Sequence, residues 1–308
     1  MNRAAEPERR VLHWTEIAPP PPDELFVVVG PTASGKTELA IRLAERFSGE
    51  IVGADSVQIY KGFDIGSGKP TAEERARAPH HLVDIADPQV PIEAQAFSDM
   101  AEAAISDIRA RHKPPIVCGG TFLWVKALVW GLAPMPAADA AIRAEHQEIA
   151  GAHGRAALHA RLAEVDPESA ARLAPNDFVR VSRALEVFAL SGRTMAAWQK
   201  EHGFRDVRHR ARLVGVFRTK EELQERIEKR TAAWLAAGWI DEVRRLIAEG
   251  CGTARAMSSV GYRSVYSYLQ GEITEEQLAP EIVRETRVLV RRQRTWLRDL
   301  DVTYVTME

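Results

Sequence analysis

The stretch 30–37 constrains the fold of this chain more than any other feature. Its sequence, Gly-Pro-Thr-Ala-Ser-Gly-Lys-Thr, fits the phosphate-binding loop pattern G-x-x-x-x-G-K-[ST]. An apolar, β-prone run at 25–29 precedes it, and 37–47 has the apolar spacing of an amphipathic helix. This succession aims backbone N–H groups and the helix dipole at one point. We therefore expect the loop to bind a polyphosphate, with Lys36 as a counter-charge and the Thr37 hydroxyl as a Mg²⁺ ligand.

Composition narrows the class of protein. The chain has 308 residues, of which 45% are hydrophobic and 27% charged, values typical of soluble globular proteins. No apolar run approaches the roughly 20 residues of a membrane helix, and the charged start does not resemble a secretory signal. The two cysteines, Cys118 and Cys251, form no CxxC pair. These features predict a cytoplasmic protein without a membrane, disulfide or cysteine–zinc framework.

Strand and helix patterns alternate through the first half of the chain. Short strands are predicted at 51–54, 81–85 and 115–118, with a helix at 94–111 between the last two. This alternation is typical of an α/β fold, here a P-loop-type parallel sheet flanked by helices.

The domain organisation follows from changes in this pattern. Prolines 134 and 136 precede an Ala-, Glu- and Arg-rich stretch with helical periodicity and no strand candidate. Strand character returns at 212–217 and again at 302–305. We therefore predict four segments: a flexible leader at 1–24, the first part of the P-loop core at 25–133, an all-helical insertion domain at 134–205, and the completion of the core with a basic C-terminal helix at 206–308.

The last long helix, predicted over 281–298, has a basic face. Five arginines recur there at spacings of three and four, so they share one side of the helix: Arg284, Arg287, Arg291, Arg294 and Arg298. The net charge of the whole chain is −2, which by itself does not indicate a nucleic-acid binder. The stripe is therefore either a solvated face or an anion-binding surface.

Asp55 is the clearest acidic residue at a strand end. The strand at 115–118 runs instead into Gly119-Gly120-Thr121 and offers no carboxylate. Because the carboxyl ends of parallel strands open into the crevice beside the phosphate loop, Asp55 can accept a proton from a nucleophile there. The alternative is that Asp55 caps a turn or binds Mg²⁺ through water.

Several separated blocks make the chain similar to a known family, the bacterial tRNA dimethylallyltransferases. The resemblance covers roughly residues 25–300. Besides the phosphate loop, its blocks are Asp55-Ser56, Gln58-Ile59-Tyr60-Lys61-Gly62, Asp64-Ile65-Gly66, Lys69-Pro70, His80-His81-Leu82-Val83-Asp84, Gly119-Gly120-Thr121, Ser182-Arg183-Ala184-Leu185-Glu186, Val260-Gly261-Tyr262 and Arg292-Gln293-Arg294-Thr295-Trp296-Leu297-Arg298.

The resemblance implies a prenyl transfer to tRNA. In this family the loop grips dimethylallyl diphosphate rather than ATP, although the pattern is shared with ATP-binding proteins. N6 of the adenine on the 3′ side of the anticodon attacks the allylic C1, and diphosphate leaves. The resemblance further implies a monomer that uses Mg²⁺ and has no membrane partner.

The same resemblance implies roles for individual residues. Asp55 would be the general base, with Thr32 and Arg226 as further catalytic residues and Thr37 as the metal ligand. The diphosphate would contact Gly30, Pro31, Thr32, Ala33, Ser34, Gly35, Lys36, Thr37 and Arg226. The tRNA would contact Asp55, Ser56, Val57, Gln58, Thr121, Arg143, Arg180, Ser182, Arg183, Gly261, Tyr262, Arg263, Arg287, Arg291, Arg294 and Arg298, and the helical insertion would cover the anticodon loop.

Three departures from the family pattern affect tRNA contacts rather than the reaction: Trp124, the pair Ser67-Gly68, and Ser258. Three other functions are compatible with parts of the sequence. A P-loop kinase would use Asp55 as base for an acceptor hydroxyl, and an adenylate isopentenyltransferase would act on free AMP. A non-enzymatic RNA-binding module would leave the phosphate loop unexplained.

Overall fold

The computed structural model describes residues 11–308, which divide into two compact units. The first unit combines the chain up to Val129 with Arg208–Glu308, and the second is Trp130–Val207. The first is an α/β unit and the second is all-helical, and the predicted insertion at 134–205 lies within the second.

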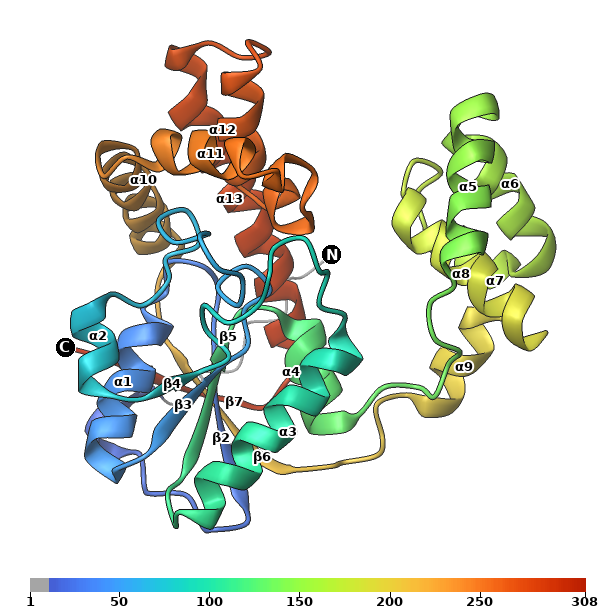
Figure 1. Ribbon diagram of the computed structural model, residues 1–308. Coiled ribbons are helices and arrows are strands. Elements are labelled where there is room, and N and C mark those ends of the chain that lie inside the picture. Colours follow the sequence, from blue (N-terminus) through green and yellow to red (C-terminus); the bar gives the residue numbers. More distant parts are fainter. Residues whose placement is uncertain (1–10) are drawn as a thin grey trace, which may run out of the picture. The chain divides into compact units, whose positions relative to one another are not determined.

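A seven-stranded sheet forms the centre of the α/β unit (Figure 1). Its strands are all parallel, and their order is β1-β7-β6-β2-β5-β3-β4. The predicted P-loop-type parallel sheet is therefore confirmed. The strands are β1 Leu12–His13, β2 Glu24–Val29, β3 Glu50–Gly53, β4 His80–His81, β5 Pro115–Gly119, β6 Arg210–Val216 and β7 Val302–Thr306.

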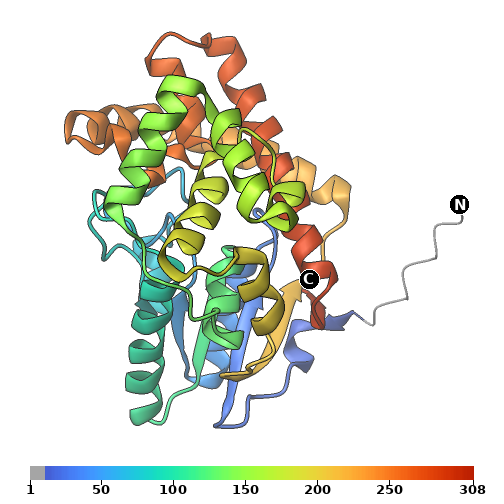
Figure 2. The same cartoon turned by 90° about the vertical axis from the view of Figure 1, so that its right-hand side faces the viewer.

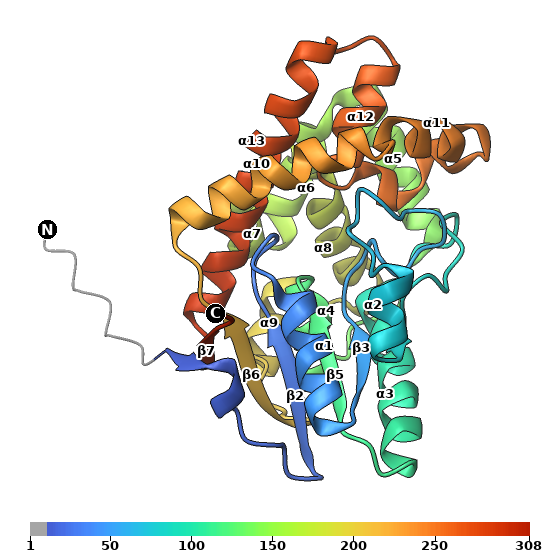
Figure 3. The same ribbon diagram turned by 90° about the vertical axis from the view of Figure 1, so that its left-hand side faces the viewer.

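Helices cover the sheet and cross above its carboxyl edge. Four of them follow strands of the sheet or their loops: α1 Lys36–Phe47, α2 Ala72–Arg77, α3 Ala94–Ala110 and α4 Phe122–Trp130. Figure 3 shows four more above the carboxyl ends of the strands, namely α10 Lys220–Ala236, α11 Trp239–Ala248, α12 Tyr262–Leu269 and α13 Glu275–Arg298. Short 3-10 helices lie at Trp14–Glu16, Cys251–Thr253 and Arg255–Ser258.

The core explains why the central strand reads as an unbroken apolar run. Every residue of β2 is buried, because strands pair with it on both sides and helices cover it. The buried face of α1 supplies Leu39, Ile41 and Leu43 to the same core. The phosphate loop is thus attached at both ends to rigid elements.

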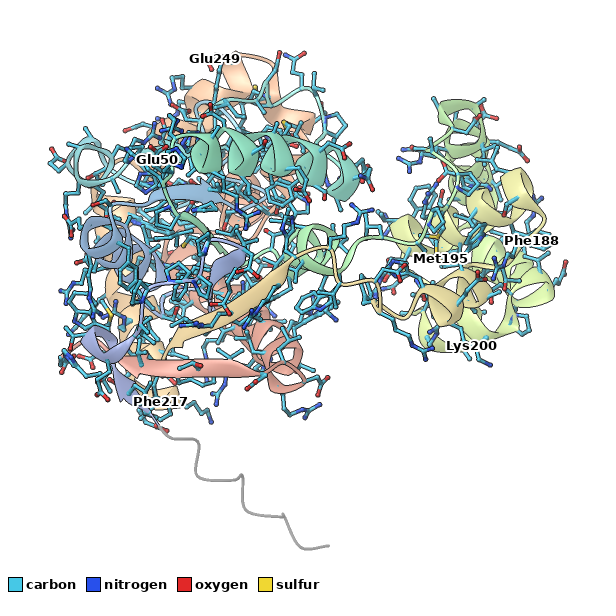
Figure 4. All side chains as sticks on the ribbon, turned by 90° about the horizontal axis from the view of Figure 1, so that it is seen from below. Glu50, Phe188, Met195, Lys200, Phe217 and Glu249 are labelled. Carbon is cyan, nitrogen blue, oxygen red and sulfur yellow. The ribbon has the colours of Figure 1, made fainter. Side chains whose placement is uncertain are left out.

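The helical unit has a core of its own. Its helices, in green to yellow in Figure 2, are α5 Ala140–His153, α6 Arg155–Val165, α7 Pro167–Arg172, α8 Phe178–Ser191 and α9 Met195–His202. Leu158, Leu162 and Val181 are fully buried there, with Met195 nearly so. Phe188 of α8 and Met195 of α9 are labelled in Figure 4.

Two local predictions were wrong. Leu12–His13 form an edge strand that pairs with β7, and Leu12 and Trp14 pack against the core, so this part of the chain is not a loose leader. Residues 1–10 lie outside the described part. The predicted strand at 81–85 ends at His81, because Leu82 and Asp84 have positive φ values of 58° and 62° that break the extended backbone. Among the described residues no helix is both long and apolar enough to cross a membrane.

Candidate active site

Three neighbouring strands deliver the predicted chemistry to one edge of the sheet. The phosphate loop follows β2, and Asp55 follows β3. Gly119 is the last residue of β5, and Gly120 and Thr121 come directly after it. Because β2, β5 and β3 are adjacent and parallel, these three segments meet at their carboxyl ends.

The phosphate loop leaves backbone N–H groups and the Lys36 ammonium available to bind an anion. Ala33 and Gly35 adopt positive φ values of 68° and 97°, and α1 begins at Lys36. Among the described residues the backbone amides of Gly35, Lys36 and Thr37 donate no hydrogen bond, and Lys36 Nζ has no partner. A helix start with open amides and an unpaired ammonium is an anion-binding site.

The residues present fit a Mg²⁺ ion only in company with a phosphate. No cluster of three or more His, Cys, Asp or Glu side chains suited to a metal occurs in 11–308. The Thr37 hydroxyl, at the start of α1, forms no hydrogen bond in the same range and is available as one ligand. Mg²⁺ commonly takes one or two protein ligands plus substrate phosphates and waters, so this donor set is compatible with it.

Asp55 is held by one oxygen and open at the other. Its Oδ1 accepts hydrogen bonds from the amides of Val57 at 2.9 Å and Gln58 at 3.3 Å, a turn that fixes the carboxylate. Its Oδ2 has no partner within the described chain. Thr121 Oγ1 accepts from the Ser56 amide at 3.0 Å, so the loop after β5 braces the turn. A carboxylate fixed through one oxygen can still take a proton with the other.

A cavity of about 100 Å³ joins Asp55 to the phosphate loop, room for about three waters. Its polar lining includes Thr32, Asp55 and Arg230. The remaining wall contains many apolar groups, and the further lining residues are Val57, Gly66, Ser67, Thr231, Trp234, Trp239, Ser259, Val260, Ile282, Thr286 and Leu289. The cavity therefore combines a base, a cation and an apolar wall.

Arg230 supplies a cation to this cavity, whereas the predicted Arg226 lies at the phosphate loop itself. Arg226 is exposed, its Nε donates to the Ala33 carbonyl at 2.7 Å, and a Cβ at Gly35 would lie 3.7 Å from its terminal guanidinium nitrogen. Its role as a counter-charge to the diphosphate stays a prediction. Arg230 lies one turn further along α10, with its guanidinium 4.3 Å from the centre of the Trp234 ring. Its Nε is buried without a hydrogen-bond partner among the described residues. Burial lowers the pKa of Arg230 to about 10, so it still carries its charge at neutral pH.

A loop that is hydrogen-bonded to α11 forms part of the cavity wall through Gly66 and Ser67. The buried carboxylate of Glu242 accepts hydrogen bonds from the amides of Asp64 at 3.2 Å and Ile65 at 2.7 Å. The Tyr262 hydroxyl donates to the same carboxylate at 2.6 Å, and burial raises the pKa of Tyr262. Gly66 has no room for a side chain, because a Cβ would lie 2.0 Å from Trp239 Nε1.

Lys69 stabilises the neighbouring loops from inside. Its side chain is nearly buried, and Nζ donates to the Tyr60 carbonyl at 2.8 Å, to Asp64 at 2.5 Å and to Asp84 at 2.7 Å. Asp64, Lys69 and Asp84 line part of a larger cavity of about 510 Å³, and Trp234 lines both cavities. The charges of Lys69 and its two carboxylate partners are paired with one another, so this cluster serves local structure.

Comparison with known proteins identifies the family. The IPP transferase family model matches residues 58–300, and the Isopentenyl transferase model matches residues 23–86. A tRNA dimethylallyltransferase of Sorangium cellulosum is 67% identical over 294 residues, covering 96% of this chain and 94% of its own. One of Geobacter metallireducens is 47% identical over 283 residues, covering 91% and 92%. The chain belongs to the tRNA dimethylallyltransferase family.

A solved structure supports the same assignment. The tRNA isopentenylpyrophosphate transferase of Bacillus halodurans is 35% identical, has a TM-score of 0.67, and is matched over 92% of this chain and 89% of its own. Membership confirms the predicted family and a prenyltransferase activity, and it excludes the P-loop kinase and the non-enzymatic RNA-binding module.

Within this dimethylallyltransferase, several residues predicted to contact tRNA are buried or hydrogen-bonded inside the protein. Tyr262 is fully buried, and Gly261 is packed where a Cβ would lie 2.2 Å from Trp239. Ser182 is buried as well, with its hydroxyl 2.9 Å from His146 Nδ1. Their positions at the start of α12 and inside α8 point them into the protein. Gln58 has its amide committed, since Nε2 donates to the Ser67 and Gly68 carbonyls at 3.0 and 2.9 Å.

Two arginines of the helical unit share a buried carboxylate. Arg143 Nε donates to Glu186 Oε1 at 2.9 Å, and Arg183 pairs with the other oxygen. Burial raises the pKa of Glu186, but the hydrogen bonds from these arginines outweigh it and hold the pKa below its ordinary value. Arg180 is exposed, and within residues 11–308 its one ion pair is with Asp177 at the start of its own helix. These pairs fasten α5 to α8 and leave Arg180 as the most exposed of the three.

The arginine stripe borders a groove between α10 and α13. Arg287, Arg291 and Arg294 are exposed and form no ion pair within the described residues, whereas Arg284 pairs with Glu281. Together with Lys220 they line a groove of about 280 Å³ floored by Leu223, Ile227 and Val290. The other predicted contact on this side, Arg263, is exposed but pairs with Glu285.

Proposed function

We propose that this chain transfers the dimethylallyl group of dimethylallyl diphosphate to N6 of the adenine 3′-adjacent to the tRNA anticodon, releasing diphosphate. The observation that carries the proposal is the cavity beside the phosphate loop that Asp55, Thr32 and Arg230 line together. A hydrolytic site would have no need of the apolar wall, whereas a five-carbon allylic group does.

The donor end of the site stabilises the leaving group. The open amides of 35–37 and the Lys36 ammonium receive the diphosphate, and Arg230 adds a second cation from α10. As the allylic C1–O bond breaks, negative charge grows on the diphosphate oxygens, and fixed donors stabilise that charge without reorganisation. Thr37 would hold a Mg²⁺ ion together with the phosphates, and the ion would supply further charge neutralisation.

The acceptor end removes a proton. An exocyclic amine is a weak nucleophile, because its lone pair is delocalised into the ring. As the N6–C1 bond forms, one N6 proton passes to Asp55 Oδ2, the oxygen that is not committed to the turn. The electron pair of the broken C1–O bond leaves with the diphosphate. The adenine must leave its stack to reach this cavity.

The basic groove between α10 and α13 supplies a surface for RNA phosphates. Three exposed arginines without ion partners in the described chain, plus Lys220, give a one-signed surface on a chain whose net charge is −2. Such contacts add affinity without reading sequence.

The proposal includes a cytoplasmic monomer. Light scattering of the purified chain and fractionation of cells that produce it measure these two properties.

The direct experiment is incubation with labelled dimethylallyl diphosphate and unmodified tRNA. Label in the tRNA, with none transferred to AMP and no steady ATP hydrolysis, is the expected result. Label on AMP instead would favour the adenylate isopentenyltransferase reaction.

A further inference from the structure

Gln293 is a buried amide in the middle of the arginine helix. It is 6% exposed, while its neighbours Arg292 and Arg294 are exposed. A buried amide is stable only when both of its ends are satisfied. Gln293 meets this requirement with two contacts far away in sequence: Oε1 accepts from the Thr32 amide at 2.9 Å, and Nε2 donates to the Gly120 carbonyl at 3.1 Å.

The two contacts join the loops on either side of the site. Thr32 belongs to the phosphate loop after β2 and lines the cavity that contains Asp55. Gly120 follows β5, the strand between β2 and β3. A Cβ at Gly120 would lie 2.8 Å from Gln293 Nε2 and 3.7 Å from Lys36 Cε, so the amide fills the space that a side chain there would need.

The hydrogen bond between the Thr32 amide and Gln293 uses none of the amides that are open to a phosphate. The amides left open for an anion are those of Gly35, Lys36 and Thr37, at the helix start. The Thr32 amide is not one of them, because it donates to Gln293 Oε1. Gln293 therefore fixes the backbone of Thr32, a residue that lines the cavity, while the phosphate-binding amides stay available.

We propose that Gln293 is a positioning residue for the transfer reaction, which holds Thr32 in the cavity that Asp55 also lines by linking the Thr32 amide to the Gly120 carbonyl. The proposal rests on the function given above. It predicts that Gln293 acts on turnover through Thr32, and that binding of the diphosphate depends little on it.

The test variant is Gln293→Met, which keeps the length of the side chain and removes both hydrogen bonds. Its kcat for transfer to tRNA should fall about 10- to 100-fold, because small misplacements of reacting groups have effects of that order. Its affinity for inorganic diphosphate and its KM for the donor should stay within about threefold, as expected when an interaction acts in the transition state.

A double-mutant cycle separates positioning from general destabilisation. In a Thr32→Ala background, Gln293→Met should change kcat by less than about twofold, because the group that it positions is gone. Leu278→Val is the matched control. Leu278 is buried at 2% on the same helix and lines none of the three cavities, so its variant should lower the melting temperature without lowering kcat.

Each remaining outcome overturns the proposal. Gln293→Met with the kcat of the wild type would do so, as would a loss that multiplies independently with that of Thr32→Ala. A loss of kcat in Leu278→Val equal to that in Gln293→Met would show that helix stability alone is responsible. Absence of transfer by the wild-type chain would contradict the proposed function itself, whereas normal wild-type transfer with an unaffected Gln293→Met contradicts only this inference.

Discussion

The two ends of strand β3 carry carboxylates with opposite surroundings. At the amino end, Glu50 (labelled in Figure 4) is 2% exposed, and its carboxylate is paired with Arg111, Lys113 and His81. At the carboxyl end, Asp55 faces a cavity with one oxygen unpaired in the described chain. Paired charges stabilise the fold, whereas the charges that are left open are those that can act on a ligand.

The positively charged side chains near the two ends of β3 differ in the same way: those near Glu50 are paired, and those near Asp55 are not paired with a carboxylate in the described chain. Hydrogen bonds from Arg111 hold the pKa of Glu50 at about 2, well below its ordinary 4.5. Near Asp55, Lys36 and Arg230 Nε have no such partner among residues 11–308. The residues that stabilise the fold and those that act on a ligand thus lie at opposite edges of one sheet. Each variant below should change either stability or function and leave the other property unchanged.

The largest effect is expected for Asp55. Asp55→Asn should lower turnover by about 10²–10⁴, because the amide can keep the turn but cannot accept the N6 proton. The melting temperature and the affinity for diphosphate should stay close to those of the wild type. Near-normal turnover with weakened Mg²⁺ dependence would assign Asp55 to the metal instead.

The second-largest effect on activity is expected for Lys36. Lys36→Ala removes a fixed cation from the leaving group, and kcat/KM for dimethylallyl diphosphate should fall by about 10²–10³. Affinity for tRNA should change little. The assignment fails if tRNA binding is lost while the donor still binds normally.

A smaller effect is expected from the basic groove. Replacing Arg291 and Arg294 together by Gln should weaken tRNA binding at moderate salt and reduce the slope of log affinity against log salt by about one to two. Preference among tRNAs should hardly change, because phosphate contacts carry no sequence information. Superimposable salt plots for wild type and double variant would leave the stripe as a solvated face. Arg284→Gln is the control, since Arg284 is already paired with Glu281.

Glu50 should affect stability and not turnover. Glu50→Gln should lower the free energy of unfolding by about 1–3 kcal/mol at neutral pH, because Arg111, Lys113 and the His81 ring lose their carboxylate partner. Since folding lowers the pKa of Glu50 from 4.5 to about 2, its contribution is complete above pH 4.5 and is lost as the pH falls toward 2. The difference between wild type and Glu50→Gln in urea melts should therefore shrink in acid. A difference that is independent of pH would contradict this assignment.

Local patterns predicted the elements that form the site. The phosphate loop, its strand and its helix could be derived from the sequence, because apolar periodicity and loop chemistry act within a few residues. Asp55 could be placed because a strand end specifies where its side chain lies relative to a parallel neighbour. The family resemblance added the reaction.

Long-range geometry accounts for what was missed. Arg226 and Arg230 are four residues apart on one helix, and only the rotation of α10 decides which of them faces the cavity. Glu242 holds a loop about 180 residues earlier, and Gln293 holds one about 260 residues earlier. Gln293 stands among exposed arginines, so only the packed helix shows that it is buried. For Tyr262, the sequence did contain a feature that favours burial over contact with RNA, namely its large aromatic side chain.

The most direct test of this division compares Asp55→Asn with Glu50→Gln in one assay of label transfer from dimethylallyl diphosphate to unmodified tRNA, at a temperature where both variants are folded. We predict that Asp55→Asn loses about 10²–10⁴ in turnover, while Glu50→Gln transfers label at the rate of the wild type. Equal losses in the two variants, or a rate for Asp55→Asn close to that of the wild type, would contradict the claim that the carboxyl edge of β3 performs the chemistry.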